Sequence, residues 1–165
     1  MIDTIFARRS IRQYTDEPVT EAQVSTLLQA AMAAPSASNR QPWHFVAIQN
    51  RDTLKALAEG HPYGRMLAGA AVGFAVCADP AISPRHWIED CSAATQNLLL
   101  AATALGLGGV WIAVWPDPTL SASVRAILEI PQTVETLCLV SVGHPAEHKP
   151  PRTQFNPQCV HRDRW

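Results

Sequence analysis

An uncharged stretch of the chain, residues 91–116, limits the folds that this sequence can adopt. A stretch of this length without charge either crosses a membrane or is buried by other protein. Polar residues such as Gln96 interrupt its first half, and three glycines at positions 106, 108 and 109 break its second half. These interruptions argue against a membrane-spanning helix. The stretch is therefore expected to be buried inside a folded domain.

Within this stretch we expect a helix over residues 84–105, closed by Gly106, and then a strand over residues 110–114. A helix with little charge on any face is buried on all sides, which in a chain of 165 residues predicts a second subunit. Charged residues make up 16% of the chain, against a typical value of about 25%, and this also favours an oligomer interface. The net charge of −1 gives no overall field for nucleic acid or membrane, so we expect neither as a partner.

The rest of the chain alternates helical and strand-like segments without a visible linker or repeat. Thr20 and Gln23 predict a capping box, while Asp52 and Asp117 are predicted to cap two further helices. The alternation predicts one α/β or α+β three-layer domain over residues 1–165. The expected helices cover residues 2–9, 20–34, 52–60 and 84–105, with one more from Asp117; the expected strands cover residues 44–48, 70–78, 110–114 and 137–142; residues 144–165 are expected to form an extended arm.

The four cysteines, at positions 77, 91, 138 and 159, show no metal-ligand spacing. Cys77 and Cys138 lie in apolar runs, where cysteine usually behaves as a small buried hydrophobic residue. Residues 1–5 do not resemble a signal peptide. We therefore expect a reducing, cytoplasmic environment and no metal site.

Residues 34–45 form the most distinctive polar loop of the chain, between an expected helix and an expected strand. Pro35 and Pro42 stiffen it, because each fixes its own φ and restricts the residue before it. Stiff backbone with Ser, Asn and Gln side chains suits hydrogen bonding to a flat ligand. The alternative is an ordinary connection in which Ser and Asn form turns.

Two clusters of cations stand far apart in the sequence. Arg8, Ser10 and Arg12 share one side in an extended segment, and guanidinium groups suit phosphate oxygens. Lys149 and Arg152 follow the last strand, where ligand contacts are often placed. The alternatives are a solvated basic patch and an exposed basic turn.

The sequence contains no motif of several other common enzyme classes. The glycines at 106–109 follow a helix and open a strand, which is the reverse of a dinucleotide-binding fingerprint. No metalloprotease, serine-hydrolase or P-loop motif is present, and no acid/base pair of carboxylates has an obvious spacing. An enzyme of this kind would take its reactivity from a redox cofactor. A thiol enzyme using Cys91 and His86 is a weaker alternative, because their spacing turns them to different helix faces.

Four segments together resemble the FMN-dependent nitroreductase family, in particular its short members. They are residues 8–14 (RRSIRQY), 34–43 (APSASNRQPW), 106–111 (GLGGVW), and 143–152 with Lys149 and Arg152. The resemblance implies an α+β three-layer sandwich with a mixed central sheet and an intertwined homodimer. It also implies that the arm, residues 144–165, is exchanged with the partner subunit.

The resemblance also implies which residues hold FMN. The phosphate would be bound by Arg8, Ser10 and Arg12, with Arg9 nearby, and by Lys149 and Arg152. The loop of the other subunit would reach the flavin, and the backbone at two glycines would approach its ring. The remaining implied contacts are Pro35, Ser36, Ala37, Asn39 and, more weakly, Gln41 from the loop, and Gly108 and Gly109.

The implied activity is transfer of hydride from NADH or NADPH through FMN to nitroaromatic, quinone or similar acceptors by a ping-pong mechanism. No protein side chain is expected to be catalytic, since the flavin carries the chemistry. The chain is short for the family, so an open pocket or a lid from residues 61–66 is expected. The alternatives are a flavin carrier or redox sensor without turnover, and a dimeric interaction module without cofactor.

Overall fold

The computed structural model describes residues 2–165, and its centre is a four-stranded antiparallel sheet. The strands are β1 (Trp43–Ile48), β2 (Val72–Ala78), β3 (Gly108–Ala113) and β4 (Glu135–Gly143), in the order β1-β2-β4-β3. A parallel component comes from an isolated bridge between Ser10 and Gly109. The expected α+β class is confirmed, while Met1 of the expected domain lies outside the described residues.

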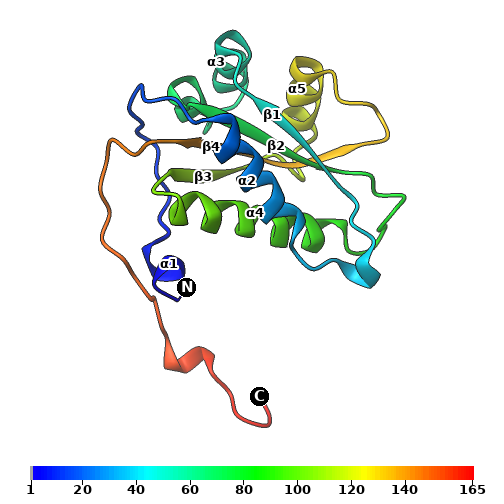
Figure 1. Ribbon diagram of the computed structural model, residues 1–165. Helices are drawn as coiled ribbons and strands as arrows, with labels where there is room; N and C mark the ends of the chain where they lie inside the picture. The colour runs from blue at the N-terminus through cyan, green and yellow to red at the C-terminus, as the bar shows by residue number, and fades with distance from the viewer. Residues whose placement is uncertain (1) are drawn as a thin grey trace.

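Helices cover both faces of the sheet and complete a three-layer sandwich (Figure 1). One face is covered by α2 (Glu21–Met32) and α4 (Trp87–Ala104), and the other by α3 (Arg51–Glu59) and α5 (Pro118–Leu128). The short helix α1 (Ile2–Ala7) begins the described chain.

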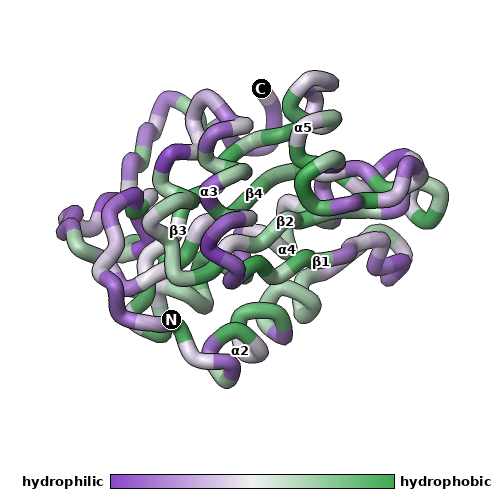
Figure 2. The backbone as a smooth tube through the Cα atoms, turned by 90° about the horizontal axis from the view of Figure 1, so that it is seen from above, coloured by the Kyte–Doolittle hydropathy of each residue, from purple (hydrophilic) through white to green (hydrophobic). Residues whose placement is uncertain are grey.

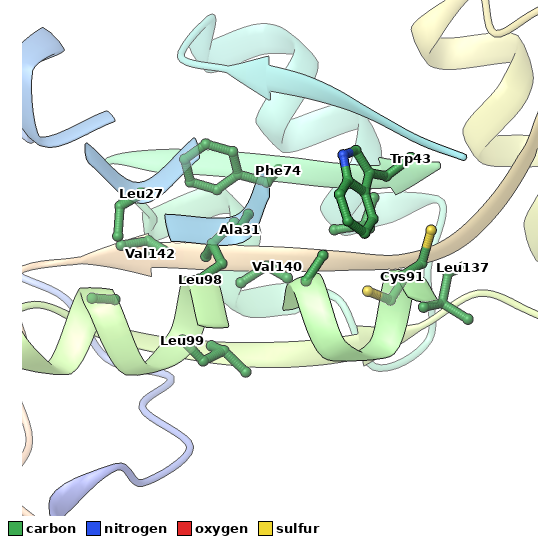
Figure 3. Packing of buried hydrophobic residues seen from close by; sticks show 14 of the residues in the cluster. Leu27, Ala31, Trp43, Phe74, Cys91, Leu98, Leu99, Leu137, Val140 and Val142 are labelled. Atoms are coloured by element: carbon green, nitrogen blue, oxygen red, sulfur yellow. The ribbon is translucent and has the colours of Figure 1, made fainter. Parts of the chain in front are cut away.

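Two hydrophobic clusters lie between these layers. In the larger one, Leu27 of α2 and Leu98 of α4 pack on Phe74 and Val140 of the sheet (Figure 3). Hydropathy along the backbone follows the same plan, because β2 and β4 are hydrophobic and polar residues gather toward the periphery (Figure 2). Cys77 and Cys138 are buried as predicted, and all four cysteines are free thiols.

Local capping signals explain most helix starts. The Thr20 hydroxyl accepts from the Gln23 backbone N–H at 3.2 Å, which confirms the capping box. Asp117 caps α5 and is followed by Pro118, also as predicted. The predicted cap at Asp52 is wrong: α3 is capped by Asn50, whose Oδ1 accepts from the Thr53 N–H at 2.9 Å.

Helix α4 differs from its prediction at its start and on its outer side. It begins at Trp87 because the Ser83 carbonyl accepts from the N–H groups of His86 and Trp87 and makes a turn there. It is not buried on all sides within one chain, since Glu89 and Gln96 are exposed. Complete burial of this helix would need another molecule on that side.

The N-terminal segment and the start of the arm run side by side. The Thr15 N–H donates to the His144 carbonyl at 2.9 Å, and the Ala146 N–H donates to the Gln13 carbonyl at 2.9 Å. The Arg152 N–H donates to the Phe6 carbonyl at 3.1 Å, and beyond it the arm leaves the body of the molecule (Figure 1). The arm is extended and irregular, as predicted, apart from a single turn at Pro157–Cys159, and its residues 150–165 are exposed.

In the part of the chain that the structure describes, no helix has both the length and the apolar character needed to cross a membrane.

Candidate functional site

The structure brings the two cationic clusters of the sequence into contact. Lys149 Nζ donates to the Ser10 carbonyl at 2.6 Å, and the Arg9 guanidinium donates to the Pro150 carbonyl. These contacts bring the segment after the last strand beside residues 9 and 10, and Arg9 and Lys149 line one cavity while Arg12 lines another. We call the polar residues of the two segments the cationic cradle, and define it as Arg8, Arg9, Ser10, Arg12, Lys149 and Arg152.

Several cradle cations have no protein acceptor. Across residues 2–165, the guanidinium groups of Arg8, Arg12 and Arg152 make no hydrogen bond and no ion pair with protein. Guanidinium groups that no protein acceptor occupies are suited to binding phosphate oxygens. The geometry therefore favours the anion-binding interpretation of both clusters over an exposed basic patch.

Glu147 is a member of the site that the sequence did not reveal. Its Oε1 accepts from the Arg12 backbone N–H at 2.5 Å, and its Oε2 lies 3.1 Å from Lys149 Nζ. The Arg12 hydrogen bond, and then the Lys149 cation, hold the pKa of Glu147 below its ordinary value. One carboxylate thus ties the arm to the N-terminal segment beside the cradle.

Glu147→Gln should reduce thermal stability near neutral pH but not in acid. A lowered folded pKa contributes stability above the unfolded pKa, and this contribution is lost as the pH falls through the folded pKa. Melting temperatures of both proteins, measured from pH 7 to pH 3, should therefore converge at the acid end. A constant difference across that range would contradict an ionised, paired Glu147.

Tyr14 anchors the same N-terminal segment to β4. Its hydroxyl donates to the Ile11 carbonyl at 2.7 Å and lies 2.7 Å from the Ser141 Oγ. Burial raises the pKa of Tyr14 to about 12, so the phenol stays neutral at physiological pH. The neutral phenol, held by two hydrogen bonds, fixes the backbone that carries Arg12.

The paired glycines are required by packing within the chain. A Cβ at Gly108 would lie 2.7 Å from the Ile11 side chain, and a Cβ at Gly109 would lie 2.9 Å from the Ser141 carbonyl oxygen. The Ile11 N–H donates to the Gly109 carbonyl at 3.1 Å, so the N-terminal segment presses directly on this strand. The implied contact of Gly108 and Gly109 with a flavin stays a prediction.

Gly108→Ala should destabilise the protein by about 1–3 kcal/mol, because the added methyl group overpacks against Ile11. It should also displace Ser10 and loosen the cradle. The matched control is Gly69→Ala, since a Cβ at Gly69 meets nothing within 4 Å. Chemical denaturation of the two variants provides the comparison, and equal stabilities would contradict the packing requirement.

A hollow of about 400 Å³ lies along the free edge of β3. The carbonyl of Gly109 points outward to Ile11, and the N–H of Val114 points inward to Leu137. Because backbone groups alternate along a strand, those of Trp111 and Ala113 face outward like those of Gly109. The hollow therefore offers backbone hydrogen-bonding groups from an edge strand. It is lined by Arg12, His61, Pro62, Tyr63, Arg65, Met66, Val110, Trp111, Ile112 and Ala113.

His61 fixes one wall of this hollow. Its Nδ1 accepts from the Tyr63 N–H at 3.1 Å, so Nε2 carries the proton and donates to the Ala113 carbonyl at 2.8 Å. The segment expected to form a lid, residues 61–66, is thereby fastened to β3. Arg65 on this segment and Arg12 of the cradle line the same space. Arg65 and Met66 belong to the segment expected to form a lid, although neither was singled out as a residue that contacts the cofactor.

The polar loop is held in an unusual backbone conformation. Ser38, Asn39 and Gln41 have φ values of 53°, 54° and 49°, and left-handed conformations at non-glycine residues are typical of functional sites. Gln41 braces the loop, since its Nε2 donates to Asn39 Oδ1 at 3.0 Å and its N–H donates to Ser36 Oγ at 3.0 Å. The loop is therefore preformed without a ligand.

Buried Asp90 fastens this loop to α4. Its Oδ1 accepts from the Ala37 N–H at 2.7 Å, and its Oδ2 accepts from the Ser83 hydroxyl at 2.9 Å. Asp90 lies in the first turn of α4, while Thr103, near the last turn, lines a cavity with Arg9 and Lys149. A helical rise of about 1.5 Å per residue separates these two positions by about 20 Å. Within one chain, the loop and the cradle are thus at opposite ends of α4 (Figure 1).

The Cys91 thiol is not suited to nucleophilic chemistry. Cys91 is fully buried, and burial raises the pKa of its thiol to about 12. Its Sγ donates weakly to the Cys77 carbonyl at 3.6 Å. The structure therefore argues against the thiol-enzyme alternative.

Comparisons with known proteins agree with this geometry. The model of the nitroreductase family matches residues 5–61 and 59–144. A protein of Archaeoglobus fulgidus, provisionally named NADH dehydrogenase/NAD(P)H nitroreductase, is 42% identical over 98% of this chain and 96% of the relative.

Two solved structures share the fold over nearly the whole chain. An FMN-dependent nitroreductase of Clostridium difficile superposes with a TM-score of 0.95 and 29% identity, and each chain is covered completely. A protein of Desulfovibrio desulfuricans, provisionally named nitroreductase and solved in complex with FMN, gives a TM-score of 0.84 and 30% identity, with 99% of this chain and 96% of that chain covered.

Proposed function

Since this chain belongs to the nitroreductase family of oxidoreductases, we propose that it binds FMN and transfers hydride from NADH or NADPH to nitroaromatic, quinone or similar acceptors. Bound FMN supplies the redox chemistry, in which reducing equivalents from the nicotinamide are stored and then passed to an acceptor in ping-pong order. The work of the chain is to hold the cofactor, orient it and supply charge. The observation that carries the proposal is the meeting of the two cationic segments.

The cationic cradle would hold the FMN phosphate. A phosphate dianion needs several charged donors when it leaves water. Among residues 2–165, the guanidinium groups of Arg8, Arg12 and Arg152 have no protein acceptor, and Lys149 is held by its bond to the Ser10 carbonyl. Ser10 and Arg9 complete the set. The donors therefore fit a doubly charged phosphate better than a single carboxylate.

The hollow along β3 would hold the flavin ring. It borders the cradle through Arg12, and its apolar wall includes Ile112 and Met66. Outward-facing backbone groups of β3 can hydrogen-bond to the polar edge of a flat ring. Arg12 and Arg65 would favour the extra negative charge of a reduced flavin electrostatically. We place the ring further along β3 than Gly108 and Gly109, where the strand edge is not covered by Ile11.

A second subunit would supply the polar loop. The loop and the cradle of one chain lie at opposite ends of α4, where Asp90 and Thr103 are about 20 Å apart, and this favours a ligand contact from the loop of a second chain. A two-fold axis that packs two α4 helices in opposite directions would bring Asp90 of one chain toward Thr103 of the other. Pro35, Ser36, Ala37, Asn39 and Gln41 would then approach the partner's flavin. Of the arm, residues 144–165, the part beyond Arg152 would cross to the partner and bury its exposed apolar residues Phe155, Val160 and Trp165.

Anaerobic stopped-flow spectroscopy tests the activity. The FMN-loaded protein should lose its flavin absorbance with NADH or NADPH and regain it when a quinone or nitroaromatic is added. A yellow protein that neither nucleotide bleaches would instead be a carrier or sensor. A protein that takes up no FMN would be an interaction module.

A further inference from the structure

A second cationic hollow lies at the other end of α4, away from the cradle. It has a volume of about 360 Å³ and is formed by the polar loop and the segment that precedes α4. No acidic residue lines it. We call it the Arg40–Arg85 hollow, and its lining is Ala37, Ser38, Arg40, Pro84, Arg85 and His86.

In the described part of the chain, the nitrogen-bearing side chains that line this hollow have no protein partners. Within residues 2–165, the side chains of Arg40, Arg85 and His86 form no hydrogen bond or ion pair. Glu89, one helical turn after Arg85, makes no ion pair with either guanidinium. Both carboxylate oxygens of Asp90 are already used, by the Ala37 N–H and the Ser83 hydroxyl. The positive charge of the hollow is therefore not neutralised internally.

Asp90 also makes the hollow a rigid site. The Ala37 N–H that it binds lies three residues before Arg40, and the Ser83 hydroxyl lies two residues before Arg85. One buried carboxylate thus fixes both segments that carry the guanidinium groups. The N-terminal end of the 18-residue helix α4 adds a favourable dipole at His86. Guanidinium groups beside a helix N-terminus, on backbone that Asp90 holds in place, are suited to phosphate oxygens.

We propose that the Arg40–Arg85 hollow binds a phosphate group of the nicotinamide dinucleotide that donates hydride. The inference rests on the proposed function, because the loop that carries Arg40 is the one expected to reach the partner's flavin. A donor stacked on that flavin would then have its phosphates within reach of the hollow. The hollow is lined by two guanidinium groups and one imidazole, and the guanidinium groups suit phosphate oxygens.

The test compares donors with and without phosphate on the FMN-loaded protein. Arg40→Ala/Arg85→Ala should weaken binding of NADPH, NADH or both about tenfold or more, measured from the concentration dependence of flavin bleaching. The phosphate-free donor 1-benzyl-1,4-dihydronicotinamide should bleach the variant and wild type at equal rates. Calorimetric titration with NADP⁺ and NAD⁺ should show the same loss. A larger loss with NADPH identifies the 2′-phosphate, and equal losses identify the pyrophosphate.

Two further variants serve as controls for the double substitution. Lys55→Ala removes an exposed cation on α3 and should change nothing, while Arg40→Lys should keep most of the affinity. The proposal is overturned if the double variant keeps its dinucleotide affinity, or if it loses activity equally with the phosphate-free donor. Failure of the proposed function has a different signature, because the wild type itself would not be bleached by that donor.

Discussion

Replacing Arg8 and Arg12 together with alanine should weaken FMN binding by roughly 100-fold or more. Hydrogen bonds to charged groups contribute about 1.5–3 kcal/mol each, and a factor of ten corresponds to about 1.4 kcal/mol. Neither guanidinium has a protein partner to lose, so the fold should be little affected. Fluorescence titration with FMN measures the dissociation constant directly.

Two controls separate a phosphate contact from a general loss of charge. Lys55→Ala removes a cation far from the cradle and should leave FMN affinity unchanged. Riboflavin lacks the phosphate, so its weak binding should be nearly the same in the double variant and in the wild type. Unchanged FMN affinity in the double variant would contradict the role of the cradle.

Asp90→Ala should destabilise the protein and release the polar loop. The substitution leaves the Ala37 N–H and the Ser83 hydroxyl without their acceptor in a buried place. Each unsatisfied buried donor costs about 1–3 kcal/mol, so the total loss should be several kcal/mol in the free energy of unfolding. Chemical denaturation measures this loss, and hydrogen exchange at residues 37–41 should rise.

Asp90→Asn provides the matched control. Asparagine keeps one oxygen for the Ala37 N–H, and its amide can donate to the Ser83 oxygen. It should therefore retain most of the stability and the protection of the loop. Equal effects of the two substitutions would show that the carboxylate charge, rather than the two hydrogen bonds, matters at this position.

Local sequence signals predicted those parts of the fold that depend on neighbouring residues. Thr20 with Gln23, and Asp117 with Pro118, mark helix starts because the caps act within one turn. The cap of α3 was misplaced because Asn50 and Asp52 are both good capping residues two positions apart. Leu54 and Leu57 of this helix are buried, which follows from helical periodicity rather than from the cap.

Candidate site residues could be predicted only where the residue type alone indicates the kind of ligand. Guanidinium groups at Arg8 and Arg12 indicate an anion whatever the fold. Asp90 and Glu147 could not be found in this way, because their partners, Ala37 and Arg12, are distant in the sequence. One side of α4 is exposed within one chain, and its burial by a second subunit stays a prediction. Low charge in the sequence indicates burial without telling whether the same chain or a second chain provides it.

In the proposed dimer, each FMN lies between the cationic cradle of one chain and the polar loop of the other. Gel filtration with light scattering and flavin absorbance measures mass and cofactor content on the same sample. We expect flavin to co-elute with a species of twice the chain mass of 18.0 kDa, at about one FMN per chain. A monomer that retains FMN at this ratio would contradict the shared site, and a dimer that binds none would contradict the cradle.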